Sequence, residues 1–259
     1  MSKTKALPDP SAEQTAEQTT PDEMTLWQHI GELRTRLFKC LLAMVVTIII
    51  TTIFGKQLIE FLAYPIGGLD KLTAIDVTEN MAVFMRVSLL GGFILALPVI
   101  LYEIIAFVVP GLTEKEQRGL FTAIPAAVLL FLGGVAFAFY VMLPAALPFL
   151  VDFLGIQTTP RLSNYISFVT SMLFWIGLSF ETPLLIFILA KLHVVTAEAL
   201  LKQWRIAVVV IAIVAAVVTP TADPINMGLL MLPLTLLYGL SIILAKFAQR
   251  EPKQEAQEA

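Results

Sequence analysis

Six long apolar stretches constrain the fold of this chain more than any other feature. They are residues 37–54, 83–109, 120–143, 165–190, 206–218 and 225–245. A helix needs about 20 apolar residues to cross a hydrocarbon core of about 30 Å, whereas barrel strands alternate apolar and polar residues in short segments. With 58% of its 259 residues hydrophobic and 14% charged, the chain is predicted to be an all-α, polytopic membrane protein.

The fifth stretch, residues 206–218, is short for a span, so the distribution of lysine and arginine decides whether it crosses. If all six stretches cross from a cytoplasmic N-terminus, only residues 56, 71, 86 and 161 of the 17 basic residues lie on the outer side. Loops on the cytoplasmic side of membrane proteins are enriched in basic residues. We therefore predict six transmembrane helices with both termini cytoplasmic.

The chain divides into three predicted regions. Residues 1–23 are rich in Gln, Glu, Thr and Pro and should form a disordered cytoplasmic tail. They lack the apolar centre of a signal peptide. Residues 24–247 form the six-span membrane domain, and residues 248–259 form a cytoplasmic C-terminal tail.

Prolines are frequent inside the predicted spans. Residues 98, 125, 183 and 233 are prolines, and helices interrupted in this way bend. Bent helices are expected to form a concave wall rather than a tight bundle. Pro144 and Pro148 are expected to break the helix and to belong to the outer loop after the third span.

Two carboxylates are predicted at the inner membrane surface. On a helix, Glu32 shares a side with His29 and Arg36, and Arg34 lies at the flank of that side. Glu116 follows Thr113 by three residues, as in a capping box, and a role in capping the helix would be enough to explain a glutamate at this position. Two carboxylates at one interface are also suited to bind a pair of guanidinium groups through charge-assisted contacts. A basic membrane anchor is the alternative interpretation of the first segment.

Glu181 lies ten residues before Lys191, about 15 Å deep in the membrane by the rise of a helix. A carboxylate at that depth costs at least ~2.5–3.5 kcal/mol unless it faces water, faces a partner or is protonated. An alternative function is therefore a proton-coupled small-solute secondary transporter that uses Glu181. Such carriers have internal repeats and several polar groups at the midplane, and this sequence has neither an evident repeat nor a second acid there.

Enzymatic chemistry is not predicted. One cysteine and two histidines do not fit the usual zinc or haem spacings, and no HExxH motif is present. Ser179 has no histidine near it in the sequence that would serve as a base. We expect no catalytic residues, no metal site and no cofactor.

Five short motifs occur in a fixed order along the spans. They are HIGELRTR at 29–36, PVILYE at 98–103, AFVVPGLTEKE at 106–116, FETP at 180–183 and TPTADP at 219–224. Over residues 24–247 the chain thereby resembles the TatC family, the multispanning receptor subunit of the twin-arginine (Sec-independent) protein translocase.

The resemblance implies a function in protein export. Members bind the twin-arginine signal peptides of folded precursor proteins at their cytoplasmic face. With single-span partner subunits of the TatA/TatB type, they export these precursors by using the proton-motive force. The resemblance also implies that partners dock at the fifth span, and that the chain belongs to an oligomeric complex in the lipid of a prokaryotic cytoplasmic (inner) membrane. No nucleic acid is expected as a partner.

The resemblance also implies roles for individual residues. Glu32 and Glu116 receive the arginine pair, and Arg34 and Phe107 belong to the same signal-peptide site. Glu181 is the intramembrane polar site. The residues implied as structural or partner contacts of the outer loops are Pro65, Thr219, Pro220 and Asp223. Gly239 stands where many members carry an acidic residue in the last span.

Overall fold

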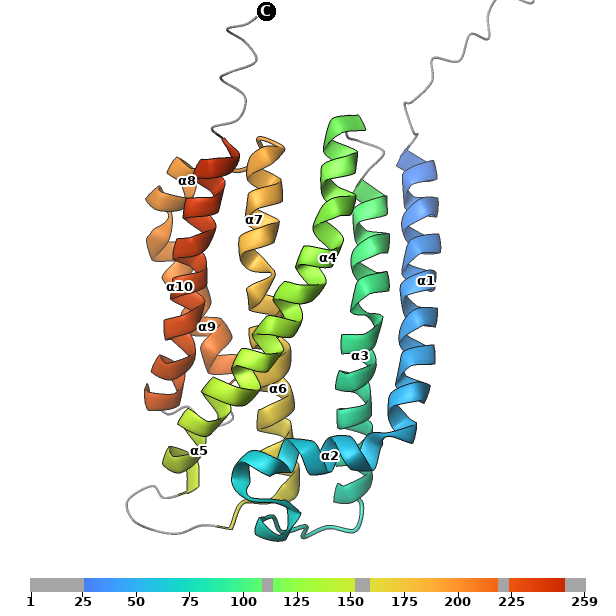
Figure 1. Ribbon diagram of the computed structural model, residues 1–259, viewed down its shortest axis with the longest axis vertical. Coiled ribbons are helices and arrows are strands. Elements are labelled where there is room, and N and C mark those ends of the chain that lie inside the picture. Colours follow the sequence, from blue (N-terminus) through green and yellow to red (C-terminus); the bar gives the residue numbers. More distant parts are fainter. Residues whose placement is uncertain (1–25, 109–113, 152–158, 219–223, 250–259) are drawn as a thin grey trace, which may run out of the picture.

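The computed structural model describes residues 26–108, 114–151, 159–218 and 224–249 (Figure 1). Within these ranges the regular structure is helical, apart from a single parallel bridge between Thr73 and Arg161. The helices that run along the long axis are α1 (Leu26–Ile53), α3 (Glu79–Val108), α4 (Glu114–Phe137), α6 (Leu162–Phe180), α7 (Thr182–Lys191), α9 (Trp204–Val218) and α10 (Pro224–Ala248).

Within the described ranges, five helical segments are long and apolar enough to cross a membrane. They are His29–Ile53, Glu79–Val108, Gln117–Pro148, Leu162–Lys191 and Met227–Ala248, and α9 is a shorter apolar helix. The all-α fold predicted from the six apolar stretches is therefore confirmed.

The ends of the helices alternate between the two ends of the molecule. In Figure 1 the start of α1, the end of α3, the start of α4 and the end of α10 lie at the upper end. The short helices α8 (Ala197–Lys202), also at the upper end, and α2 (Gly55–Ala63), at the lower end, lie outside this alternation. The arrangement agrees with six crossings, and the cytoplasmic location of the upper end stays a prediction.

The sequence predicted that the third span ends before Pro144, and this prediction is wrong. The helix continues from α4 through a π-helical turn (Ala138–Met142) into α5 (Leu143–Val151), which contains Pro148. Pro144 has no N–H for an intrahelical bond, and its ring needs room beside the carbonyl of Tyr140. The wider π turn lies over that carbonyl and gives the ring this room, so the proline is accommodated without breaking the helix.

The helices α1 and α3 pack closely along their whole length. The Thr47 hydroxyl donates to the carbonyl of Gly92 at 2.8 Å, and the Thr51 hydroxyl donates to the carbonyl of Ser88 at 2.7 Å. A Cβ on Gly92 would lie 2.9 Å from the Cα of Ile48. Small residues and hydroxyl hydrogen bonds let two membrane helices approach this closely, and they fix the register of α1 on α3.

The lower end is closed by an ion-pair cluster between segments far apart in the sequence. Arg161, just before α6, donates from Nε to Glu79 Oε2 at 3.0 Å, and it also pairs with Asp76. Hydrogen bonds to Glu79 and Asp76 raise the pKa of the Arg161 guanidinium. Nearby, the Tyr165 hydroxyl donates to the carbonyl of Leu62 at 2.8 Å, which holds α2 against α6. These contacts join α2 and the residues just before α3 and α6 to one another at the lower end.

Candidate functional site

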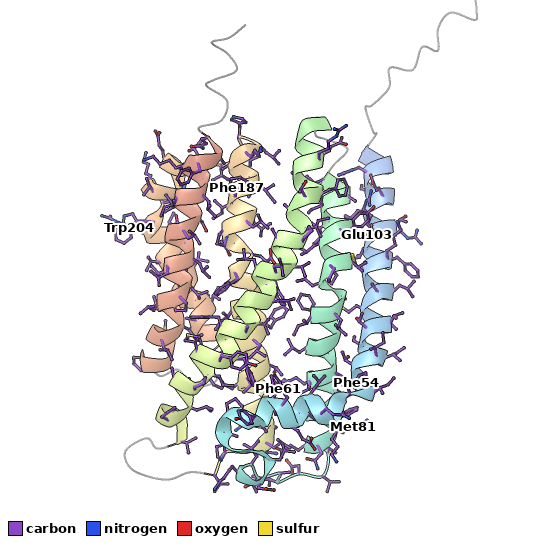
Figure 2. The ribbon with its side chains drawn as sticks, viewed as in Figure 1. Phe54, Phe61, Met81, Glu103, Phe187 and Trp204 are labelled. Atoms are coloured by element: carbon purple, nitrogen blue, oxygen red, sulfur yellow. The ribbon has the colours of Figure 1, made fainter. Side chains whose placement is uncertain are left out.

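Four charged side chains meet between α1 and α3 at the upper end of the molecule. Glu32 Oε1 accepts hydrogen bonds from Nε (2.9 Å) and Nη2 (2.5 Å) of Arg36. Nη1 of the same guanidinium donates to Glu103 Oε2 at 3.0 Å, and Lys39 Nζ lies 3.6 Å from Glu103 Oε1. We call Glu32, Arg36, Lys39 and Glu103 the charge quartet. Figure 2 shows Glu103 near the upper end of α3, on the side of α1.

Helix geometry and burial explain why these four charges pair. Glu32 and Arg36 are four residues apart and therefore lie on one side of α1, the side that packs on α3. The Glu103 side chain is only 7% exposed, and a carboxylate buried in an apolar helix needs cationic partners. Arg36 and Lys39 supply these partners, and the apolar residues Ile30, Leu33 and Leu37 are left exposed on the other side of α1.

An aromatic pair lies about one helical turn from the charge quartet. The rings of His29 and Phe107 are stacked, with centroids 4.3 Å apart and planes 23° from parallel. His29 precedes Glu32 by almost one turn of α1, and Phe107 follows Glu103 by one turn of α3. The same register that pairs Arg36 with Glu103 therefore places a partly exposed aromatic surface beside the carboxylate of Glu32.

The structure brings together some of the predicted site residues. Glu32 and Phe107 lie in the same interface, and Glu116 is the third residue of α4, whose first turn is at the same end (Figure 1). The side chain of Glu116 lies outside the described part of the chain. The expected position of Arg34 at the flank of the Glu32 side is wrong: Arg34 is exposed and, at 100° per residue, lies on the opposite side of α1, away from Glu32.

The predicted outer-loop residues are at the other end or outside the described ranges. Pro65 lies in a short 3₁₀ turn (Tyr64–Ile66) after α2, at the lower end. Thr219, Pro220 and Asp223 belong to residues that the structure does not describe.

The sequence interpretation missed the partnership of Arg36 and Glu103. It named Glu103 only as part of a motif, without a partner, and gave Arg36 no role of its own. The i,i+4 spacing of Glu32 and Arg36 was a usable signal, and so was a carboxylate inside an apolar stretch. The identity of the partner across the helices was not available, because it depends on the register of α1 on α3.

Glu181 lies at the break between α6 and α7, directly before Thr182 and Pro183. It is only 4% exposed, and its Oε1 is buried with no hydrogen-bond partner in the described ranges. Glu181 does not line the neighbouring cavity, whose walls on this side carry Ser179 and Thr182. The role of Glu181 as an intramembrane polar site stays a prediction.

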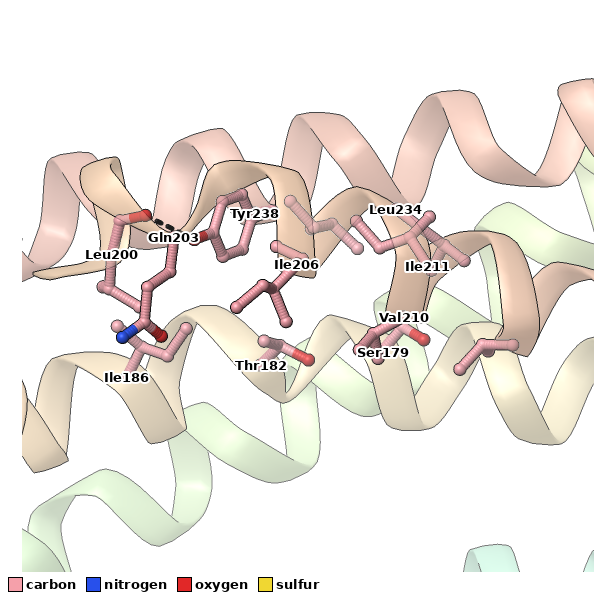
Figure 3. Close-up of a pocket in the computed structure, with 13 residues that line it drawn as sticks. Ser179, Thr182, Ile186, Leu200, Gln203, Ile206, Val210, Ile211, Leu234 and Tyr238 are labelled. Atoms are coloured by element: carbon pink, nitrogen blue, oxygen red, sulfur yellow. Dashed lines mark hydrogen bonds between the residues drawn. The ribbon is translucent and has the colours of Figure 1, made fainter.

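That cavity, of about 340 Å³, lies between α6/α7 and the hairpin of α9 and α10 (Figure 3). Its walls are mostly apolar, and at one end the hydroxyl of Tyr238 donates to the carbonyl of Leu200 at 2.8 Å. The outer surface of α9 beside the cavity exposes a row of β-branched side chains at helical spacing. They are Ile206, Val209, Val210, Ile213 and Val217.

Comparison with known proteins gives a consistent result. The sequence model of the family described as Sec-independent protein translocase protein (TatC) matches residues 28–233. The protein of that name from Carboxydothermus hydrogenoformans is 37% identical over 234 residues, covering 89% of this chain and 96% of that protein. The one from Synechocystis sp. is 36% identical over 228 residues, covering 83% and 89%.

A solved structure agrees with the sequence matches. The crystal structure titled Twin Arginine Translocase Receptor TatC superposes with a TM-score of 0.77 at 34% identity. The match covers 86% of this chain and 100% of that one.

Proposed function

This chain belongs to the TatC family of Sec-independent protein translocase proteins, and we propose that it is the subunit that binds twin-arginine signal peptides of folded precursors. As a family member with several apolar helices, it is a multi-pass protein of the inner membrane and a subunit of the twin-arginine translocase. The proposed binding site lies at the upper end of α1, α3 and α4, and this end faces the cytoplasm.

One observation carries the proposal. Glu32 Oε2 is buried and has no hydrogen-bond partner among the described residues, although Oε1 of the same carboxylate accepts two hydrogen bonds from Arg36. A carboxylate oxygen that is shielded from water and unpaired is a strong acceptor for a guanidinium group. The stacked rings of His29 and Phe107 lie beside it and offer apolar contact to the adjoining residues of a peptide.

The distribution of basic residues supports the proposed orientation. Arg34, Arg118, Lys202 and Arg205 belong to parts of α1, α4, α8 and α9 toward the upper end, and Lys56, Lys71 and Arg161 belong to segments at the lower end. Basic residues concentrate on the cytoplasmic side of membrane proteins. A signal peptide arriving from the cytoplasm would therefore meet the end that carries Glu32 and the first turn of α4.

The energetics favour a partly buried site. Exposed ion pairs contribute only ~0.2–1 kcal/mol each, whereas hydrogen bonds to charged groups shielded from water contribute ~1.5–3 kcal/mol. Glu32 is about one-fifth exposed, which is intermediate between the two cases. A lysine cannot make the two parallel contacts of an arginine, so the site should distinguish a twin-arginine from a twin-lysine peptide by more than charge alone.

Export itself requires partners. In our proposal, single-span subunits of the TatA/TatB type dock at the fifth span, and the complex uses the proton-motive force. The exposed row of Ile206, Val210, Ile213 and Val217 on α9 supports this docking surface, because its spacing suits packing against one apolar helix.

Binding of synthetic signal peptides to the full-length protein in detergent tests the proposal. The variants Glu32→Gln and Glu116→Gln should each weaken binding of a twin-arginine peptide about tenfold, the effect of one charge-assisted hydrogen bond. Glu198→Gln is the matched control, because it removes one exposed carboxylate from α8 at the same end of the molecule. Its affinity should stay within about twofold of the wild type, as for an exposed charge.

The opposite pattern would contradict the proposal. Glu32 and Glu116 do not recognise the arginine pair if the wild-type protein binds twin-lysine and twin-arginine peptides equally well. The same follows if the control variant Glu198→Gln weakens binding as much as Glu32→Gln and Glu116→Gln do.

A further inference from the structure

We propose that Arg36 is an internal competitor for the signal peptide: it holds Glu32 in the free protein and is released to Glu103 when a peptide arginine binds. This inference rests on the proposed function, since it concerns how the same site selects its ligand. It makes Arg36 a positioning residue that sets both the affinity and the specificity of recognition.

The first argument is that a guanidinium already occupies the proposed recognition carboxylate. Arg36 directs Nε and Nη2 at Glu32 Oε1, at 2.9 and 2.5 Å. This is the kind of contact that a peptide arginine would make with the same acid. A peptide arginine therefore has two ways to bind: to Oε2 alone, which has no partner within the described ranges, or to both oxygens after Arg36 has moved away.

The second argument is that Arg36 can release Glu32 without becoming an unpaired buried charge. Its Nη1 donates to Glu103 Oε2 at 3.0 Å, and the Glu103 side chain is 7% exposed on a different helix. Removing the partner of a buried charge is costly when no other partner remains. With Glu103 as a second acceptor, Arg36 stays paired during the exchange. The ion pair of Arg36 with Glu32 is lost and that of the peptide arginine with Glu32 is formed, so the free energy of the exchange is close to zero.

The third argument comes from the formal charge of the quartet. Two carboxylates, Glu32 and Glu103, face two cations, Arg36 and Lys39, so their formal charges cancel. A neutral cluster attracts cations weakly at long range. The ligand must then displace Arg36 by better hydrogen-bond geometry, which arginine offers and lysine does not. Without Arg36 the cluster would be net negative and would also attract lysine.

Lys39 provides a control that separates exchange from net charge. It carries the same charge as Arg36 and pairs with the same Glu103, but it is 55% exposed and its ion pair does not involve Glu32. Arg36→Gln and Lys39→Gln therefore remove the same unit of charge from the quartet. Only Arg36→Gln also vacates Glu32 Oε1.

The experiment measures dissociation constants of twin-arginine and twin-lysine peptides for the full-length protein in detergent. Arg36→Gln should bind the twin-arginine peptide about tenfold more tightly, and its preference for arginine over lysine should fall, because one charge-assisted competitor is gone. Lys39→Gln should tighten binding by at most about threefold, as expected for an exposed charge. Glu103→Gln should weaken binding, because Arg36 then depends on Glu32 alone.

Arg36→Lys keeps the charge and tests the proposal again if Arg36→Gln does not fold. A lysine holds Glu32 less firmly, so the variant should also bind the twin-arginine peptide more tightly than the wild type. A residue with a merely structural role would weaken binding in both variants and lower the unfolding temperature.

The inference is overturned if Arg36→Gln weakens binding of the twin-arginine peptide, or if it changes the affinity no more than Lys39→Gln does. If Arg36→Gln does not fold, weaker binding by Arg36→Lys overturns it. The wild type and Glu32→Gln show whether the proposed function itself has failed. If the wild type prefers the twin-arginine peptide and Glu32→Gln loses that binding, the site is correct and only the exchange is wrong.

Discussion

Two carboxylates within the apolar spans, Glu103 and Glu181, have different surroundings. Glu103 contacts two cations of α1, whereas Glu181 Oε1 is buried without a hydrogen-bond partner in the described ranges. A buried carboxylate without a cation is expensive in a membrane, so a polar group at such a position is expected to have a functional reason. Glu103 serves the site proposed here, and Glu181 belongs to a separate part of the molecule.

We expect the polarity of Glu181 to matter for export. Glu181→Gln keeps a hydrogen-bonding side chain of the same shape, whereas Glu181→Leu removes both polar atoms. In a reconstituted export assay with a twin-arginine precursor, the leucine variant should lose about tenfold more transport than the glutamine variant, the effect expected if export uses one hydrogen bond of this side chain. Equal transport by both variants and the wild type would remove any role of this side chain in export.

At the scale of helices, the pair of α1 and α3 determines the geometry of the site. Pro98 lies inside α3 without ending it, and the two helices contact each other from Thr51 to His29. The hydroxyls of Thr47 and Thr51 fix the register toward the lower end of the pair. Arg36 reaches Glu103 only in this register, so contacts toward the lower end of the two helices help to position the charges near the upper end.

This dependence explains how far the sequence alone could predict the molecule. Apolar stretches and basic residues predicted the helices, their number and their alternation, because these depend on composition along the chain. The continuation of the helix through Pro144 was missed, since the accommodating π turn has no sequence signature. Glu32 and Phe107 were expected in one site by resemblance. The hydrogen bond from Arg36 to Glu103 was not predicted, because it joins residues 67 positions apart in the sequence.

A substitution at Gly92 tests the role of this interface. A Cβ there would lie 2.5 Å from Ile48 Cγ1 and 2.9 Å from its Cα, so α1 would have to move away from α3. Gly92→Ala should lower the free energy of unfolding in mixed micelles by about 1–3 kcal/mol, as overpacking does. It should also weaken binding of the twin-arginine peptide, because the charge quartet loses its register.

Gly133→Ala is the control for that measurement. Gly133 is also helical, but a Cβ on it would meet no atom within 4 Å. Its stability should be unchanged or slightly higher, because alanine favours helix. If the two variants unfold alike, the close contact of α1 and α3 is not what holds the pair together.

At the scale of the whole molecule, the two ends differ in construction. The lower end is held together by Arg161, Glu79 and Asp76. The upper end presents the rings of His29 and Phe107 and a Glu32 oxygen that has no partner among the described residues. The helix α9 has 15 residues and is about 22 Å long, which is less than a hydrocarbon core of about 30 Å. The bilayer is therefore expected to thin beside α9, where we propose that partners dock.

The most direct test of the proposed site is photocrosslinking of a precursor in membrane vesicles. A photoreactive phenylalanine analogue replaces Phe107 at the upper end or, as a control, Phe61 of α2 at the lower end (Figure 2). We expect a crosslink from position 107 to a precursor with a twin-arginine signal peptide, its loss when both arginines are replaced by lysine, and no crosslink from position 61. Equal crosslinks from position 107 to both precursors, or a crosslink only from position 61, would contradict recognition of the arginine pair by Glu32 and its neighbours.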